Sequence, residues 1–138
     1  MASYLLDANH ASPLVTIRHS LRKRILDGLA AGHSFAIAAP VLTEMLFGIS
    51  LLPRAAQNRA EWLRLKPHIA CITIQESDAE QAAELQVQMR RRGWQLETVD
   101  ALCATIALRH DLILLTTDHD FNPIPDLKLE NWLKPVSE

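Results

Sequence analysis

Short apolar runs alternate along this chain with longer segments of helical periodicity, and this alternation restricts the possible folds more than any other feature. The runs predict strands at residues 4–6, 35–39, 69–74 and 112–115, with a short edge strand at 128–130. Residues 112–115 lack a polar face, as expected for a parallel strand covered on both sides. The sequence therefore predicts an α/β fold: a short, mostly parallel four- or five-stranded sheet, flanked by helices on both faces.

Helix start and stop signals fill the segments between these strands. The pair Ser12-Pro13 predicts the start of a helix that Gly32 ends, with Leu14, Ile17, Leu21 and Ile25 on one apolar face. A capping box at Ser77–Glu80 predicts the start of another helix, which Gly93 ends. The remaining helices are predicted at 40–52, 54–66 and 98–109.

Residues 34–52 carry one ionisable side chain, Glu44, which raises the question of a membrane span. Pro40 interrupts the segment, and a carboxylate at bilayer depth would be costly, so a buried strand followed by a buried helix is expected. Cys71 and Cys103 lack metal-ligand spacing and are predicted to be buried, reduced thiols. With no secretory signal visible, we expect one cytoplasmic domain, residues 1–138, with no membrane partner.

Five acidic residues fall at positions that a parallel sheet would bring to one edge. Asp7 follows the first strand, and Asp118 and Asp120 follow the strand at 112–115. Asp100 lies in the first turn of a helix, and Glu44 lies one turn into another. Each aspartate alone has an ordinary explanation as a turn residue or as a partner of the helix dipole. Glu44 differs, because a solitary charge in an apolar segment is seldom buried without a partner.

Five converging carboxylates would repel one another, and a divalent cation would relieve that repulsion. Oxygen ligands of this kind suit Mg²⁺, or alternatively Mn²⁺, better than zinc. Such clusters serve phosphodiester hydrolysis, in which one or two ions activate a water nucleophile. The net charge of −2 does not exclude a nucleic-acid substrate, because five of the sixteen acids would surround metal.

The acids lie in four short motifs that keep their order along nearly the whole chain. The motifs are Asp7-Ala-Asn9 after an apolar strand, Glu44 with Gly48 four residues later, Asp100 leading into an Ala-rich helix, and Asp118-His-Asp120-Phe after a strand and a threonine. Together they resemble the motifs of PIN domains, and in length and pattern the chain resembles the VapC-like toxins of type II toxin–antitoxin systems. Many members carry Asn where Asp118 stands, so direct metal contact by Asp118 or by Asp120 stays open.

The resemblance implies that Asp7, Glu44, Asp100 and Asp118 are the catalytic, metal-binding acids, with Asp120 beside them. Asn9 and Thr116 flank the matched motifs and are candidates to orient water or a carboxylate. The resemblance further implies an endoribonuclease acting on tRNA or another structured RNA, a homodimer, and a cognate antitoxin protein. The alternatives are an RNA-processing PIN nuclease outside such a pair and a non-catalytic PIN scaffold that binds RNA or protein.

Three other features bear on nucleic-acid binding. The basic clusters 22–24 and 90–92 could contact phosphates, or could be solvated helix surfaces. His119 could polarise a phosphate or point to solvent. Tryptophan can stack on unpaired bases, although in helices it more often packs in a core or an interface; the chain has Trp62, Trp94 and Trp132.

Overall fold

The computed structural model describes residues 1–133, which contain one five-stranded sheet in the order β3-β2-β1-β4-β5. Every neighbouring pair of strands is parallel, which confirms the predicted α/β class. The strands are β1 (Ser3–Leu6), β2 (Ser34–Ala38), β3 (Ala70–Ile72), β4 (Ile113–Leu115) and β5 (Leu129–Glu130).

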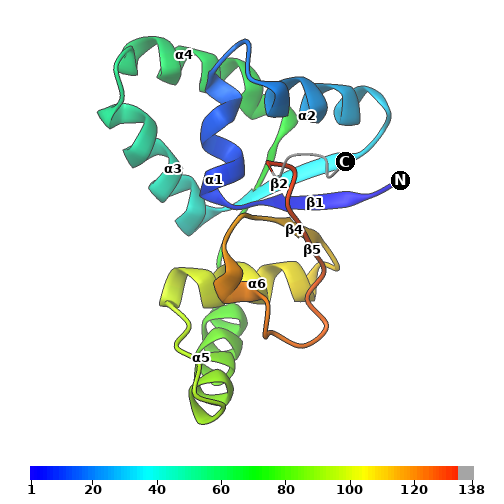
Figure 1. Ribbon diagram of the computed structural model, residues 1–138, viewed down its shortest axis with the longest axis vertical. Helices are drawn as coiled ribbons and strands as arrows, with labels where there is room; N and C mark the ends of the chain where they lie inside the picture. Colours follow the sequence, from blue (N-terminus) through cyan, green and yellow to red (C-terminus); the bar gives the residue numbers. More distant parts are fainter. Residues whose placement is uncertain (134–138) are drawn as a thin grey trace.

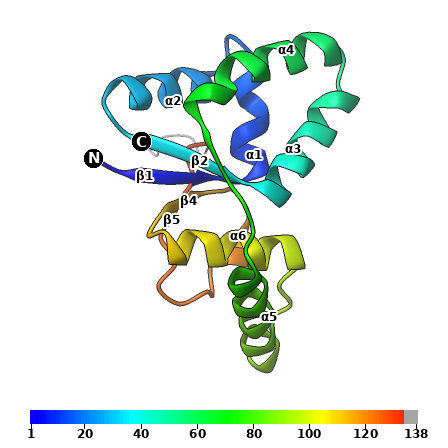
Figure 2. The same ribbon diagram turned by 180° about the vertical axis from the view of Figure 1, so that it is seen from behind.

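Helices cover both faces of this sheet (Figures 1 and 2). On one side lie α1 (Ala8–Ala11), α2 (Ser20–Ala30), α3 (Ala39–Leu51) and α4 (Ala55–Leu65). On the other side lie α5 (Glu76–Arg91) and α6 (Thr98–Arg109). Among the described helices, none is long and apolar enough to cross a bilayer.

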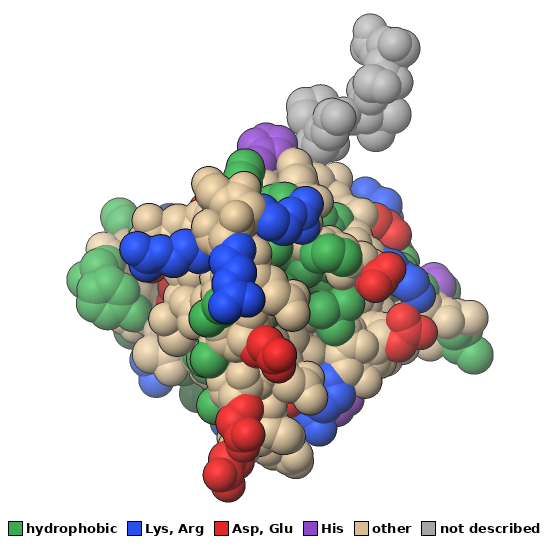
Figure 3. Space-filling view, turned by 90° about the horizontal axis from the view of Figure 1, so that it is seen from below, with side chains coloured by type: hydrophobic (Ala, Val, Ile, Leu, Met, Phe, Trp, Pro, Cys, Tyr) green, Lys and Arg blue, Asp and Glu red, His purple; other side chains and the backbone are tan. Residues whose placement is uncertain are grey.

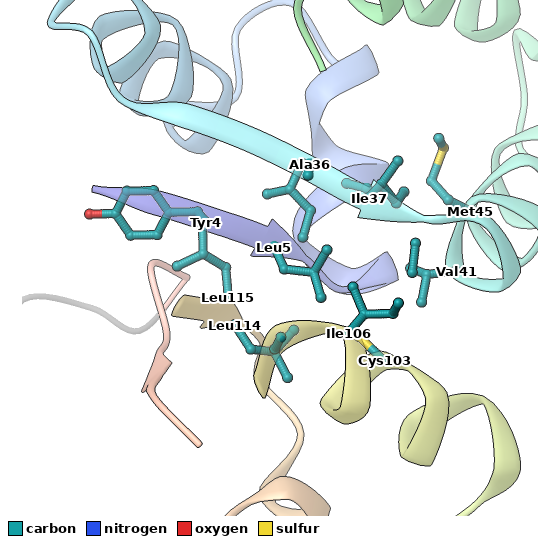
Figure 4. Packing of buried hydrophobic residues seen from close by; sticks show 14 of the residues in the cluster. Tyr4, Leu5, Ala36, Ile37, Val41, Met45, Cys103, Ile106, Leu114 and Leu115 are labelled. Atoms are coloured by element: carbon teal, nitrogen blue, oxygen red, sulfur yellow. The ribbon is translucent and has the colours of Figure 1, made fainter. Parts of the chain in front are cut away.

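The core lies between the central strands and the helices that begin at their carboxyl ends. Leu5 of β1 and Leu114 of β4 are fully buried, and Figure 4 shows them beside Ile106 of α6. Val41 and Met45 of α3 close the core near the end of β2. Because α1, α3 and α6 all start at this sheet edge, side chains from their first turns can meet there.

The first helical segment differs from the prediction of one helix ending at Gly32. The chain forms α1, then a 3₁₀ turn at Ser12–Val15, and then α2, which starts at Ser20. Asp7 starts the helical segment early because its carboxylate accepts the Ala8 N–H, and Thr16 takes an extended conformation that breaks the helix. Ile17 therefore falls between helices and is 69% exposed, rather than joining an apolar helix face.

Three further expectations need correction. The capping box of α5 is formed by Gln75 and Asp78, not by Ser77 and Glu80, because the helix begins at Glu76. Cys71 is exposed because β3 is an edge strand, whereas Cys103 is buried as predicted. The segment 34–52 forms β2 and α3, but α3 buries only one face, on which Val41, Met45 and Ile49 lie.

Candidate active site

Asp7 lies at the carboxyl end of β1, where its side chain joins two strands and a helix. Its Oδ1 accepts the Ala8 N–H at 2.8 Å, and its Oδ2 accepts the Thr116 hydroxyl at 2.7 Å. Asn9 Nδ2 donates to the same Oδ2 at 3.3 Å. These donors fix a carboxylate that is only 7% exposed, so its orientation is set before any ligand arrives.

Thr116 also determines how the chain turns after β4. Its Oγ1 accepts the Asp118 N–H at 3.0 Å, and the Asp118 carboxylate in turn accepts the Asp120 N–H at 2.9 Å. A short chain of hydrogen bonds that starts at Asp7 therefore positions Asp118 and the backbone of Asp120. Thr116 thus contacts both Asp7 and the backbone of Asp118.

Asp100, in the first turn of α6, faces these two aspartates across the sheet edge. One carboxylate oxygen from each of Asp100, Asp118 and Asp120 lies within 4.8 Å of the other two. Asp100 and Asp118 are half-buried, and Asp120 is exposed. These three residues, hereafter the carboxylate trio, form a site of three oxygen donors that opens to solvent on one side.

Negative charge accumulates around Asp100, and within residues 1–133 the charges that act on it are all acidic. Burial, followed by the charges of Asp7, Asp118, Glu44 and Asp120, raises the pKa of Asp100 to about 7. A carboxylic acid with such a pKa is half-protonated near neutrality, because ionising it would add another negative charge to the site. The repulsion predicted from the sequence is therefore present in the structure.

Glu44 lies at the margin of this site rather than inside the core. It is exposed on α3, and burial followed by the charge of Asp7 raises its pKa. The expectation that Glu44 is buried and needs a partner was therefore wrong, because α3 turns this side chain toward solvent. The charges of Asp7 and Glu44 help to raise the pKa of Asp100, and the carboxylate trio is the tightest grouping of acidic oxygens.

A buried histidine supports Asn9, and the sequence analysis did not identify it. His10 is fully buried, and its Nε2 accepts the Trp132 backbone N–H at 3.0 Å. Because that nitrogen accepts, Nδ1 of the neutral ring carries the proton and donates to Asn9 Oδ1 at 2.6 Å. Burial, and then the charge of Arg24, lowers the pKa of His10 to about 4, so the ring stays neutral at pH 7.

This arrangement links the segment after β5 to Asp7. Asn9 Oδ1 also accepts the Thr117 N–H at 3.2 Å, so the amide can present its Nδ2 group only toward Asp7 and Thr116. Asn9 therefore contacts the Asp7 carboxylate, and His10 and the Thr117 N–H fix the Asn9 amide in that orientation. The only signal in the sequence was the place of His10 directly after Asp7-Ala-Asn9.

The basic clusters have different surroundings. In the cluster 22–24, Arg22 pairs with buried Glu61 at 2.6 Å, and Arg24 lies 4.0 Å from the ring centroid of Trp132. In the cluster 90–92, Arg92 donates to the Pro123 carbonyl at 3.2 Å, close to the loop that carries Asp120. His119 is exposed and contacts Asn122 at 3.3 Å, so its ring packs against its own turn.

A family profile agrees with this geometry. The profile of the PIN domain matches residues 4–127, which include every candidate acid. The chain belongs to the PIN domain family. The four motifs noted in the sequence therefore lie in a PIN domain of parallel α/β architecture, as expected.

Individual relatives of this PIN domain are named ribonucleases. The chain is 26% identical to Ribonuclease VapC2 of Rickettsia felis over 132 residues, which is 95% of this chain and 98% of the relative. It is also 26% identical to Ribonuclease VapC4 of Mycobacterium tuberculosis over 101 residues, or 72% and 78% of the two chains.

Solved structures extend the similarity to the fold. A chain of VapBC2 from Rickettsia felis, bound to a DNA fragment from its promoter, matches with a TM-score of 0.81 and 25% identity, covering 94% of this chain and 98% of that one. A chain of DNA-bound VapBC from Salmonella typhimurium matches with a TM-score of 0.79 and 19% identity, covering 96% and 99%.

Proposed function

We propose that this PIN domain is a metal-dependent endoribonuclease that hydrolyses RNA phosphodiester bonds and serves as the toxin of a VapBC-type pair. The carboxylate trio carries the proposal, because three oxygen donors within 4.8 Å of one another match the needs of a small divalent cation. The names of the curated relatives, two VapC ribonucleases, support the substrate class.

The residues of the site fit a divalent cation. The charges that raise the pKa of Asp100 are all acidic, so the site has negative charge in excess. We assign Asp7, Glu44, Asp100 and Asp118 as the catalytic, metal-binding acids, with Asp120 as a further ligand, and Mg²⁺ or alternatively Mn²⁺ as the cation. When bound, the cation supplies activation of water and stabilisation of charge on the phosphate.

The protein's own contribution is orientation and charge. Thr116 and Asn9 hold the Asp7 carboxylate in one orientation through hydrogen bonds at 2.7 and 3.3 Å. Asp100 takes up a proton below about pH 7 and releases it above, so its ligand form is present on the alkaline side. The described part of the site offers carboxylates rather than a nucleophilic side chain, which favours water as the nucleophile.

The proposed partners are an RNA substrate, such as tRNA or another structured RNA, a cognate antitoxin protein and a second copy of the chain, all in the cytoplasm. Exposed apolar side chains support a protein partner: Phe47 is 67% exposed, Leu51 71% and Leu52 51%. These residues lie on α3 and at its end, on the side of the sheet opposite α5 and α6 (Figure 1). An RNA-processing nuclease outside a toxin–antitoxin pair would share the site but not the antitoxin.

Cleavage of purified tRNA and total RNA tests the function. The purified chain with Mg²⁺ or Mn²⁺ should give discrete fragments that disappear with EDTA and with Asp7→Asn. Asp27→Asn is the matched control, because Asp27 is an exposed acid on α2 that pairs with Lys23 away from the site. Intact RNA from folded protein with either metal would favour the non-catalytic scaffold, and equal cleavage by Asp7→Asn would refute this site.

A further inference from the structure

The three tryptophans have different surroundings in the structure. Trp62 is buried at 4% exposure, and Trp132 packs edge-on against Tyr4 at 4.8 Å between ring centroids, with Arg24 over its ring. Trp94, in the loop between α5 and α6, is 37% exposed. Among the three, Trp94 alone combines high exposure with a position beside the carboxylate trio.

Trp94 is held in place at that border. Its indole Nε1 donates to the Asp120 carbonyl oxygen at 3.1 Å, and its backbone N–H donates to the Met89 carbonyl at 2.9 Å. Gly93 makes the turn possible, because its φ of +79° lies in the left-handed region that favours glycine. Trp94 is therefore fixed through its backbone and through its indole nitrogen, while part of the residue stays exposed to solvent.

A hollow beside the indole is lined by Arg90, Gly93, Trp94 and Gln95. A Cβ added at Gly93 would meet no residue beyond its chain neighbours within 4 Å, so the turn before Trp94 faces open space. Arg90 and Arg91 are exposed at the end of α5. Figure 3 looks at the molecule from this end and shows Lys and Arg side chains gathered on the part nearest the viewer.

We propose that Trp94 and Arg90 form a subsite for one unpaired nucleotide of the RNA, next to the scissile phosphate. The base stacks on the indole, and the guanidinium of Arg90 contacts the adjoining phosphate. Aromatic rings accept any base with an exposed face, and a guanidinium beside the ring attracts the phosphate of the same nucleotide, so the pair can hold one nucleotide at the border of the carboxylate trio. This subsite rests on the proposed function and specifies the single-stranded character of its substrate.

The subsite predicts a defined effect on RNA binding without cleavage. Affinity for a dye-labelled single-stranded hexaribonucleotide is measured by fluorescence anisotropy in the presence of Mg²⁺, using Asp7→Asn protein so that the RNA stays intact. Quenching of intrinsic fluorescence reports contact of the RNA with the indole. Trp94→Ala should weaken binding by about tenfold, the loss expected for one stacked base. Trp94→Phe, which keeps a ring, should recover most of the affinity but lose the fluorescence quenching, and Trp132→Phe, the matched control, should change neither.

Two further arms test the phosphate contact and the single-stranded preference. Arg90→Gln should lower the slope of log affinity against log salt concentration by about one unit. A duplex RNA of the same sequence should gain nothing from Trp94, since its bases are stacked on one another. Thermal melting of each variant checks that the loop between α5 and α6 keeps its fold.

Equal affinity of the Trp94→Ala and Trp94-containing proteins, or no binding of the hexaribonucleotide by either, would overturn the subsite. Because binding is measured without cleavage, this failure is distinct from failure of the proposed function. A chain that cleaves RNA with unchanged binding in Trp94→Ala keeps the nuclease and loses the subsite. A chain that binds through Trp94 but never cleaves keeps the subsite and loses the nuclease.

Discussion

Two aspartates occupy the same place in neighbouring helices and have opposite surroundings. Asp78 is the third residue of α5, and Asp100 is the third residue of α6. Asp78 is fully buried, accepts the Gln75 N–H at 2.9 Å and lies 2.8 Å from the Arg109 guanidinium. Asp100 is half-buried, and the charges that shift its pKa come from four other acids.

The difference contrasts an acid that has a structural partner with one whose surroundings fit the proposed metal site. A buried carboxylate with a cation and a capping role closes one end of a helix and joins α5 to α6. A carboxylate surrounded by other carboxylates does not stabilise the fold, and a ligand of opposite charge would relieve the repulsion. The contrast therefore lies in the surroundings: Asp78 pairs with Arg109, whereas the charges that act on Asp100 are all acidic.

The largest expected effect comes from removing the functional acid. Asp100→Asn should lower RNA cleavage by at least about a thousandfold, because it removes a ligand of the cation that stabilises charge in the reaction. The urea concentration at the midpoint of unfolding, measured on metal-free protein, should stay the same or rise, because one repelling charge has been removed. A marked loss of stability in Asp100→Asn would mean that Asp100 is structural like Asp78.

The reverse pattern is expected for the structural acid. Asp78→Asn leaves Arg109 without its buried partner and should cost about 3 kcal/mol of unfolding free energy, measured by urea denaturation. Cleavage per folded molecule should stay near the wild-type value, because Asp78 lies outside the carboxylate trio. If fully folded Asp78→Asn protein lost RNA cleavage, Asp78 would not be a purely structural acid, and the contrast with Asp100 would be wrong.

His10 provides a smaller and more selective test of how Asp7 is oriented. The Asn side chain in His10→Asn can still donate where Nδ1 donates, whereas Gln in His10→Gln reaches the position of Nε2 instead. We expect His10→Gln to lower Mn²⁺ affinity by about tenfold in calorimetry, with a smaller loss in His10→Asn. If both variants bound Mn²⁺ as tightly as the wild type does, Asn9 would need no support from His10.

The pH dependence of metal binding gives a graded effect. Asp100 has a pKa of about 7 in the folded chain, above its ordinary value, so protons compete with the cation below that pH. Mn²⁺ affinity should fall by up to about tenfold for each pH unit below about 7 and level off above it. In Asp100→Asn protein, Mn²⁺ affinity should no longer depend on pH near neutrality. If the affinity still fell with falling pH, the competing proton would bind to another group.

Stability of the metal-free chain should show two opposing trends over the same pH range. The raised pKa of Asp100 means that its ionisation destabilises the fold as pH rises from about 4 to 7. The pKa of His10, lowered to about 4, means that stability is lost as pH falls from about 6.5 to 4. Urea unfolding of Asp100→Asn should therefore show a steeper loss of stability in acid than the wild type does.

The sequence predicted the elements well where apolar runs and prolines marked their limits. Pro40 and Pro53 bracket α3 closely, and the predicted helix at 98–109 matches α6. The helical segment after β1 was misjudged because its start depends on the Asp7 side chain, which serves both as a cap and in the site. Local propensity carries no information about such a double role.

The site could be predicted in outline because parallel strands bring their carboxyl ends to one edge. Spacing alone could not show that Asp100, Asp118 and Asp120 group tightly while Glu44 faces solvent, since that depends on the rotation of α3. The contribution of His10 was also hidden, because its partner Trp132 is 122 residues away in the chain. Contacts of that range depend on the assembled fold.

Diffraction from Mn²⁺-loaded crystals, grown above pH 7 and measured at the manganese absorption edge, tests the central claim most directly. The account predicts an anomalous peak at about 2.1 Å from a carboxylate oxygen of Asp100 and from at least one of Asp118 and Asp120. An Asp100→Asn crystal under the same conditions should show a weaker peak or none. A wild-type crystal with manganese bound elsewhere, and none at the carboxylate trio, would contradict the account.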